Sequence, residues 1–209
     1  MGDSKEKMKS SHSSDLRMIL ESITKLNYLN PDDIPNIPLY MDQVLSFLDE
    51  QLMSYKRFDD DKIMTKTMIN NYTKNNLLPP PDKKKYSKNH LILLIFIYYF
   101  KNFLSISDIQ KIFGPLAEMF FDDKAELSLD DVYRHVFDLE YKGMEILMKD
   151  VVAKFKMSDD AFPKTGDTKK DDALSTFAYI CMLSFDVYVK KLIIEKLVDL
   201  KAPDENKTE

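Results

Sequence analysis

Apolar residues recur at helical spacing in several separate stretches of the chain. The first apolar stripe consists of Leu16, Ile19, Leu20, Ile23 and Leu26. It predicts an amphipathic helix over residues 15–29 with Ser14 as its N-cap. The second stripe consists of Met41, Val44, Leu45, Leu48 and Leu52, and it predicts a helix over residues 41–52. Three prolines within residues 30–38 predict a non-helical connector between the two helices.

A short helix with two different faces is predicted over residues 65–76, after a loop at 54–61. Its apolar side consists of Met68, Ile69 and Tyr72, and its polar side consists of Thr67, Asn70, Asn71 and Lys74. Three prolines at 79–81 prevent the helix from continuing. We expect them to hold the lysine-rich segment 82–86 in an extended conformation.

The next helix is apolar on nearly every side. It is predicted to run from Ser87, its N-cap, to about Phe103, and its only charged residue after Lys88 is Lys101. A helix of this kind lies at the centre of a domain. Ser105 to Asp108 has the pattern of a capping box, which predicts a short helix that ends at Gly114-Pro115.

Two long helices follow, over residues 129–156 and 172–200, joined by a polar loop at 157–170. In the last helix, large apolar residues face several directions, and they include Phe177, Tyr179, Ile180, Phe185, Tyr188, Ile193 and Leu197. This pattern fits the centre of a C-terminal helical domain, and it equally fits a dimer interface or a hydrophobic effector pocket. Cys181 is expected to be a small buried hydrophobic residue.

The composition favours an all-α protein, because four Gly and no Trp in 209 residues are few for a fold rich in sheet turns. We expect disordered tails at 1–14 and 203–209 around a domain at 15–116 and a helical dimerisation or effector region at 117–202. The single cysteine excludes an intramolecular disulfide and fits a reducing cytoplasm. No uncharged stretch reaches the roughly 20 residues of a membrane helix, so no membrane association is expected.

The charge of the chain is unevenly distributed. Residues 62–88 contain seven lysines and one acidic residue, which gives this segment a charge of +6 within a chain of net charge −5. The remainder therefore carries −11. A basic segment in an acidic chain predicts a local contact with an anionic partner, whereas the acidic remainder disfavours indiscriminate binding to nucleic acid.

Signatures of enzymes are absent from the sequence. It contains no Gly-rich phosphate loop, no nucleophile elbow and no pair of His at metal-ligand spacing. Asp131 and His135 are four residues apart, which on a helix usually indicates a surface contact. We therefore predict no enzymatic activity, no catalytic residue, no metal and no cofactor.

The polar helix and the lysines after it suggest binding to double-stranded DNA. A short helix can enter the major groove, where Asn pairs with adenine and Lys reaches guanine or phosphate. Thr67, Asn70, Asn71 and Lys74 are therefore the predicted base-reading residues. The lysine-rich segment would lie along the phosphates. The simpler alternative is an exposed polar helix next to a solvated run of charge.

A resemblance to a known family covers residues 62–113. The segment from Asn70-Asn71-Tyr72 through Leu77-Leu78-Pro79-Pro80, with Tyr86-Ser87 and the capped helix at Ser105, resembles the DNA-binding domain of MerR-type transcription regulators. Asn76 stands where that family has a turn glycine, and Asn tolerates the left-handed conformation. Residues 34–113 more closely resemble a bacterial family called domain of unknown function 1836.

The MerR resemblance implies a winged helix-turn-helix domain in a cytoplasmic bacterial regulator. The residues that it implies as phosphate contacts are Lys66, Tyr72, Lys83, Lys84, Lys85 and Tyr86. A homodimer is expected, because two-fold protein symmetry matches palindromic operators. An unknown small-molecule effector remains possible. The competing hypothesis is a protein-interaction module on a winged-helix scaffold that no longer binds DNA. A third possibility is a C-terminal domain that binds or transforms a small molecule.

Overall fold

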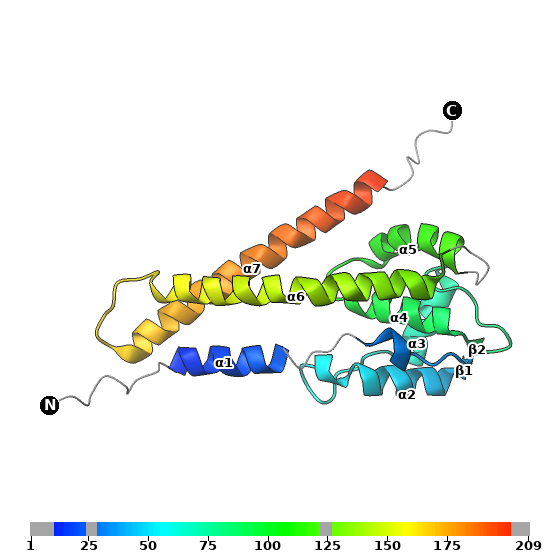
Figure 1. The fold of residues 1–209 in the computed structure, drawn as a ribbon, viewed down its shortest axis with the longest axis horizontal. Helices are drawn as coiled ribbons and strands as arrows, with labels where there is room; N and C mark the ends of the chain where they lie inside the picture. Colours follow the sequence, from blue (N-terminus) through cyan, green and yellow to red (C-terminus); the bar gives the residue numbers. More distant parts are fainter. Residues whose placement is uncertain (1–10, 24–28, 122–126, 202–209) are drawn as a thin grey trace. The chain divides into compact units, whose positions relative to one another are not determined.

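The computed structural model describes residues 11–23, 29–121 and 127–201. Within these ranges it contains seven α-helices, two short 3-10 helices and one two-stranded sheet (Figure 1). This content confirms the predicted all-α class. In the described residues no helix combines the length and the apolar character needed to cross a membrane.

The helices follow the predicted order. They are α1 (Ser11–Ile23), α2 (Met41–Gln51), α3 (Lys66–Lys74), α4 (Lys88–Phe100), α5 (Ile106–Phe120), α6 (Leu129–Asp159) and α7 (Thr168–Lys201). The 3-10 helices are η1 (Pro31–Asp33) and η2 (Met53–Tyr55), and the strands are β1 (Leu39–Tyr40) and β2 (Lys85–Tyr86). The strands pair antiparallel, with Leu39 opposite Tyr86 and Tyr40 opposite Lys85.

The chain divides into two compact units. The first comprises Met1–Leu26 and Tyr141–Lys190, and the second comprises Asn27–Glu140 and Lys191–Glu209. Helices α6 and α7 therefore each contribute to both units. The boundary expected from the sequence, at 116/117, falls inside α5.

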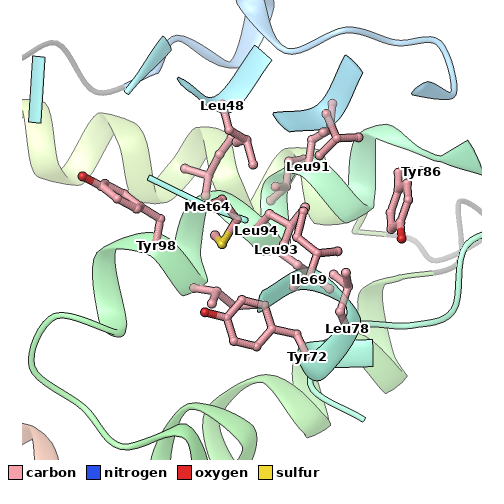
Figure 2. Packing of buried hydrophobic residues seen from close by; sticks show 14 of the residues in the cluster. Leu48, Met64, Ile69, Tyr72, Leu78, Tyr86, Leu91, Leu93, Leu94 and Tyr98 are labelled. Atoms are coloured by element: carbon pink, nitrogen blue, oxygen red, sulfur yellow. The ribbon is translucent and has the colours of Figure 1, made fainter. Parts of the chain in front are cut away.

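Helix α4 forms the centre of the second unit, as its nearly uniform apolar sequence predicted. Its residues 91–95 are completely buried, and Leu48, Ile69 and Leu78 pack into the same core (Figure 2). The helix begins after Ser87, whose backbone N–H donates to Nδ1 of His90 at 3.0 Å. This contact satisfies one of the backbone donors that a helix start leaves unpaired.

His90 is itself part of this core. Its ring packs edge-on against Tyr86 and Phe121, with centroid distances of 5.5 and 4.8 Å. Burial lowers the pKa of His90 because it disfavours the charged imidazolium. The side chain therefore serves in its neutral form, with Nδ1 accepting the hydrogen bond from Ser87.

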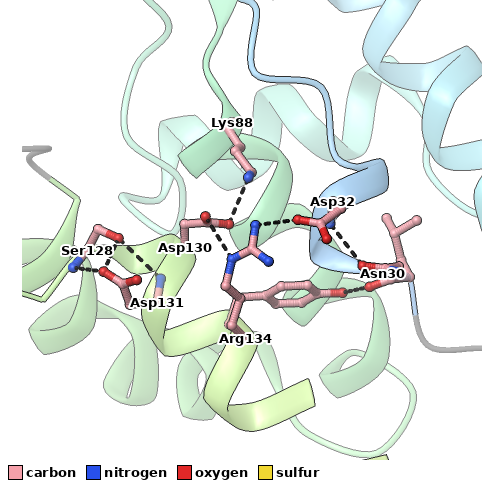
Figure 3. Close-up of polar contacts among 9 residues, drawn as sticks. Asn30, Asp32, Lys88, Ser128, Asp130, Asp131 and Arg134 are labelled. Atoms are coloured by element: carbon pink, nitrogen blue, oxygen red, sulfur yellow. Dashed lines mark hydrogen bonds and ion pairs between the residues drawn. The ribbon is translucent and has the colours of Figure 1, made fainter. Parts of the chain in front are cut away.

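The start of α6 is tied back to the connector around η1 by polar contacts. Asp130 pairs with Lys88 at 2.8 Å and with Arg134 at 3.2 Å, and Arg134 also reaches Asp32 at 2.7 Å (Figure 3). Asn30 in turn accepts a hydrogen bond from the backbone of Asp32 at 3.0 Å. These contacts connect the start of α6 to both η1 and the start of α4.

Helix α5 corrects one prediction. It was expected to end at Gly114-Pro115, but it continues to Phe120 with Pro115 inside it. Ser105 does cap the helix, since its Oγ accepts from the backbone N–H of Asp108 at 3.1 Å. The residues beyond the proline that pack against the core are Leu116 and Phe120. Their burial offsets the loss of one backbone hydrogen bond at Pro115.

Other boundaries also differ from the predicted ones. Helix α1 begins at Ser11, so Ser14 lies inside the helix and is not its N-cap. The rest of the predicted N-terminal tail, residues 1–10, and the predicted tail at 203–209 lie outside the described residues. The connector at 30–38 contains the short helix η1, which its prolines permit because Pro31 occupies the first helical position.

The first unit has a small core of its own. Leu16, Phe155 and Tyr179 are buried together, and the Tyr179 hydroxyl donates to the carbonyl of Val151 at 3.2 Å. Cys181 was expected to be buried, but it is exposed. The apolar residues of α7 exceed what one neighbouring helix can cover, so the residues on its other sides remain exposed.

Candidate nucleic-acid interface

Helix α3 presents the two faces that its sequence predicted. Thr65 caps the helix, because its Oγ1 accepts from the backbone N–H of Met68 at 3.2 Å. Ile69 and Tyr72 are buried against α4 in the core of the second unit, where Figure 2 shows both side chains. The apolar side is therefore held by packing, and the opposite side faces solvent.

The four predicted base-reading residues, Thr67, Asn70, Asn71 and Lys74, are all exposed. Within the described residues, the side-chain amides of Asn70 and Asn71 make no hydrogen bond, and Lys74 has no carboxylate partner. Each amide offers two donors and one acceptor group. This face of α3 thus carries side-chain polar groups that no contact with the described residues uses.

The end of α3 is fixed by a turn at Asn76, which has a φ of +54°. Asn76 therefore adopts the left-handed conformation, which Asn tolerates better than most residues with a Cβ. The carbonyl of Tyr72 accepts from the backbone N–H groups of Leu77 and Leu78, at 2.8 and 3.2 Å. Gln110 of α5 donates to the carbonyl of Asn75 at 2.8 Å. Contacts from α5 therefore help to position α3.

The lysine-rich segment folds differently from the prediction. Instead of running extended, residues 82–85 form a tight turn, which we call the lysine turn, and the backbone N–H of Lys85 donates to the carbonyl of Asp82 at 2.8 Å. Its central residues Lys83 and Lys84 have φ values of +47° and +65°. The three prolines fix only the chain before Asp82, and the pairing of β2 with β1 then bends the segment.

Positive φ at two lysines is unfavourable. A two-residue hairpin turn of this hand favours Asn-Gly, since a side chain with a Cβ costs about 1–2 kcal/mol in the left-handed region. Residues held in such conformations concentrate at functional sites. The lysine turn therefore places two exposed ammonium groups at a cost in stability.

Lys85 contacts an aromatic ring that the sequence did not indicate. Its Nζ lies 5.2 Å from the centre of the exposed Tyr40 ring, and the two residues are paired between β2 and β1. Such a cation–π contact holds the lysine side chain near one position. Tyr40 lies 45 positions before Lys85 along the chain, so only the strand pairing could have revealed this neighbour.

Two of the predicted phosphate-binding residues are mainly core residues. Tyr72 and Tyr86 are each only 4% exposed, and burial raises the pKa of both phenols. Their apolar rings are part of the same core as α4. For Tyr72 this agrees with the helical spacing, which placed it on the apolar side of α3. Contacts of Tyr72 and Tyr86 with a phosphate would therefore be limited to their hydroxyl groups.

The predicted cations remain accessible. The exposed lysines of the basic segment that form no ion pair within the described residues are Lys62, Lys66, Lys74, Lys83, Lys84 and Lys85. Lys88 differs, because it pairs with Asp130 and is largely covered. Five of these six lysines lie on α3 or in the lysine turn, and Lys62 precedes α3.

The Asp131–His135 pair is a surface contact, as expected. Nδ1 of His135 lies 2.8 Å from the backbone carbonyl of Asp131 and does not contact its carboxylate. That carboxylate accepts hydrogen bonds from Ser128, which lower the pKa of Asp131. The carboxylate caps the start of α6.

Comparison with protein families gives one match. A family model described as "Domain of unknown function (DUF1836)" matches residues 29–136. The chain belongs to this family. The matched DUF1836 region contains α2 to α5, the lysine turn and the start of α6, and so includes every candidate site residue. Comparisons with curated proteins and with solved structures give no significant match.

Proposed function

We propose that this DUF1836 protein is a DNA-binding transcription regulator with a MerR-like winged helix-turn-helix domain. Helix α3 enters the major groove, where Thr67, Asn70, Asn71 and Lys74 contact base edges. The lysine turn with the adjoining two-stranded sheet is the wing, in which Lys83, Lys84 and Lys85 contact phosphates, and Lys66 adds a further phosphate contact.

The observation that carries this proposal is the uncommitted polar face of α3. Asn70 and Asn71 are adjacent and exposed, and their side-chain amides form no intramolecular hydrogen bond in the described part of the chain. An Asn amide can donate to and accept from adenine in a bidentate pair, which is worth about 1–3 kcal/mol of discrimination between bases. A helix anchored by Ile69 and Tyr72 would hold these amides rigidly.

The lysine turn fits a role in phosphate binding. Eight residue steps separate Lys74 from Asp82, so these residues lie at most about 30 Å apart. One turn of the duplex is about 34 Å long, so a single binding site accommodates both. Ammonium groups attach a protein to any DNA sequence, which makes the lysines the source of affinity and α3 the source of specificity.

A homodimer is part of the proposal, with α7 as its contact surface. Phe177 and Tyr188 of this helix are 61% and 58% exposed, and Ile180 and Phe185 are exposed as well. Exposed apolar surface of this extent commonly marks a protein–protein contact. Sedimentation should show a dimer that dissociates when Phe177 and Tyr188 are both replaced by Glu, whereas a monomeric wild-type protein would contradict this part.

Fluorescence anisotropy with a pool of fragments from the source genome tests the proposal. The wild-type protein should bind at low salt, and its affinity should fall steeply as the salt concentration rises. Selection and sequencing of the bound fragments should recover a shared motif. If no fragment binds at low salt, the regulator function is wrong, and the exposed lysines are then better explained by an acidic protein partner.

A matched control separates a specific site from general charge. Lys83, Lys84 and Lys85 are replaced by Ala in one variant, and the exposed residues Lys142, Lys156 and Lys169 in another. Both variants lose the same formal charge. Only the first should bind DNA at least tenfold more weakly, since the control lysines lie outside the proposed interface. Equal losses in both variants would contradict a specific role for the lysine turn.

A further inference from the structure

The segment that joins α2 to α3 lines a partly open cavity against the end of α4. Its volume is about 400 Å³. The charged residues that line it are four cations, Lys56, Arg57, Lys62 and Lys101, and one carboxylate, Asp61. The nearby Asp59 and Asp60 do not line the cavity, so its wall carries a net charge of +3.

Lys101 is the cation that most needs a counterion. It is partly buried, and its Nζ donates to the carbonyl of Ile63 at 2.7 Å and lies 5.1 Å from the centre of the Tyr98 ring. In the described residues it has no carboxylate within ion-pair distance. Burial lowers the pKa of Lys101, because a desolvated ammonium without a counterion is unfavourable.

The one acidic residue of the wall is already engaged. Oδ2 of Asp61 accepts hydrogen bonds from the backbone N–H groups of Arg57 and Phe58, both at 3.0 Å. These bonds close the loop and direct the carboxylate toward its own backbone. Asp61 therefore supplies loop geometry, and it does not form an ion pair with the cations of the wall.

The cations of the cavity wall differ in whether they already form an ion pair. Lys56 pairs with Asp49 at 2.7 Å. Arg57 and Lys62 are exposed and form no ion pair in the described part of the chain. The cavity thus has two exposed cations without an ion pair and the partly buried ammonium of Lys101. Its polar lining suits an anion better than an apolar ligand.

We propose that this cavity binds a small oxyanion, a molecule that carries a phosphate or carboxylate group. Arg57 has the planar fork that matches both groups, Lys62 adds a second charge, and the bound oxygen supplies the counterion that Lys101 lacks. The volume lies within the range of about 300–1,000 Å³ that is usual for small-molecule sites. This site does not depend on DNA binding.

Thermal unfolding of the full chain tests the site, with inorganic phosphate and citrate as probes and sodium chloride at matched ionic strength as the reference. At least one probe should raise Tm saturably. The expected rise is about 2–4 °C when the probe is at roughly five times its dissociation constant. If neither probe raises Tm beyond the chloride reference, the site does not exist.

Variants connect the effect to the cavity. Arg57→Gln/Lys62→Gln should abolish the shift, and because both side chains are exposed the variant should remain folded. Lys142→Gln/Lys169→Gln loses the same charge elsewhere and should keep the shift. A shift that survives in Arg57→Gln/Lys62→Gln would overturn the proposal. If Arg57→Gln/Lys62→Gln weakened DNA binding and left the phosphate effect unchanged, the proposal would also be wrong, because Arg57 and Lys62 would then belong to the DNA contact.

Discussion

The hydroxyl of Tyr133 donates a hydrogen bond to the backbone carbonyl of Leu29, 2.7 Å away and 104 residues earlier in the chain. Both residues are buried. Leu29 is the first residue of the DUF1836 match, and Tyr133 lies in the first turns of α6, close to the end of the match. This bond therefore joins the two ends of the family domain.

Replacement of Tyr133 by Phe should destabilise the protein by about 1–3 kcal/mol, because the Leu29 carbonyl would remain buried without its partner. Urea unfolding measures the change. Tyr141→Phe on the same helix is the control, since Tyr141 is 74% exposed and its variant should unfold like the wild type. Equal midpoints for wild type and Tyr133→Phe would show that this bond does not stabilise the domain.

Stability should fall as the pH drops below about 6.5, the ordinary pKa of histidine. The pKa of His90 is lowered in the folded state by burial, so the unfolded state takes up a proton first. The stabilisation is fully present above about pH 6.5 and is lost as the pH falls toward the lowered value. Unfolding free energies measured between about pH 7 and pH 5 should show this loss.

A pair of variants assigns the effect. His90→Gln keeps an acceptor that can reach the Ser87 N–H but does not titrate, so the dependence on pH in this range should become flatter. His135→Gln removes an exposed histidine from α6, and the pH dependence of stability should remain that of the wild type. An unchanged pH profile in His90→Gln would refute the role of the buried imidazole.

The strained lysine turn should lower the folding stability of the protein while it strengthens DNA binding. Lys84→Gly removes the left-handed strain at a φ of +65° and should stabilise the protein by up to about 1 kcal/mol, while binding to DNA becomes weaker. Lys85→Gly is the comparison, because Lys85 lies in β2 and is not strained, so this variant should gain no stability. A loss of stability in Lys84→Gly would show that the turn is not strained.

Much of the second unit could be predicted from the sequence because local signals and packing agree there. Ser87 and Ser105 both precede their helices as predicted, and the apolar run of α4 indicated its central place. Gly114-Pro115 predicted the end of the helix, but α5 continues because Leu116 and Phe120 pack against the core. A pattern of local breakers contains no information on such distant contacts.

The candidate site was predictable only in part. The division of α3 into a buried and an exposed face follows from a spacing of 3.6 residues, so Asn70 and Asn71 were placed correctly on the solvent side. The lysine turn and the Lys85–Tyr40 contact depend on the pairing of two strands of two residues each. Such short strands have no detectable alternation.

Salt dependence of DNA binding tests the central proposal most directly, with the motif recovered from the selected fragments as the probe. The slope of log affinity against log salt should become shallower by up to about three when Lys83, Lys84 and Lys85 are replaced by Ala, about one for each lost phosphate contact. Asn70→Ala/Asn71→Ala should keep the wild-type slope but lose about 1–3 kcal/mol of discrimination against a mutated motif for each base contact removed. An unchanged slope in the lysine variant, together with unchanged discrimination in the asparagine variant, would contradict the proposal.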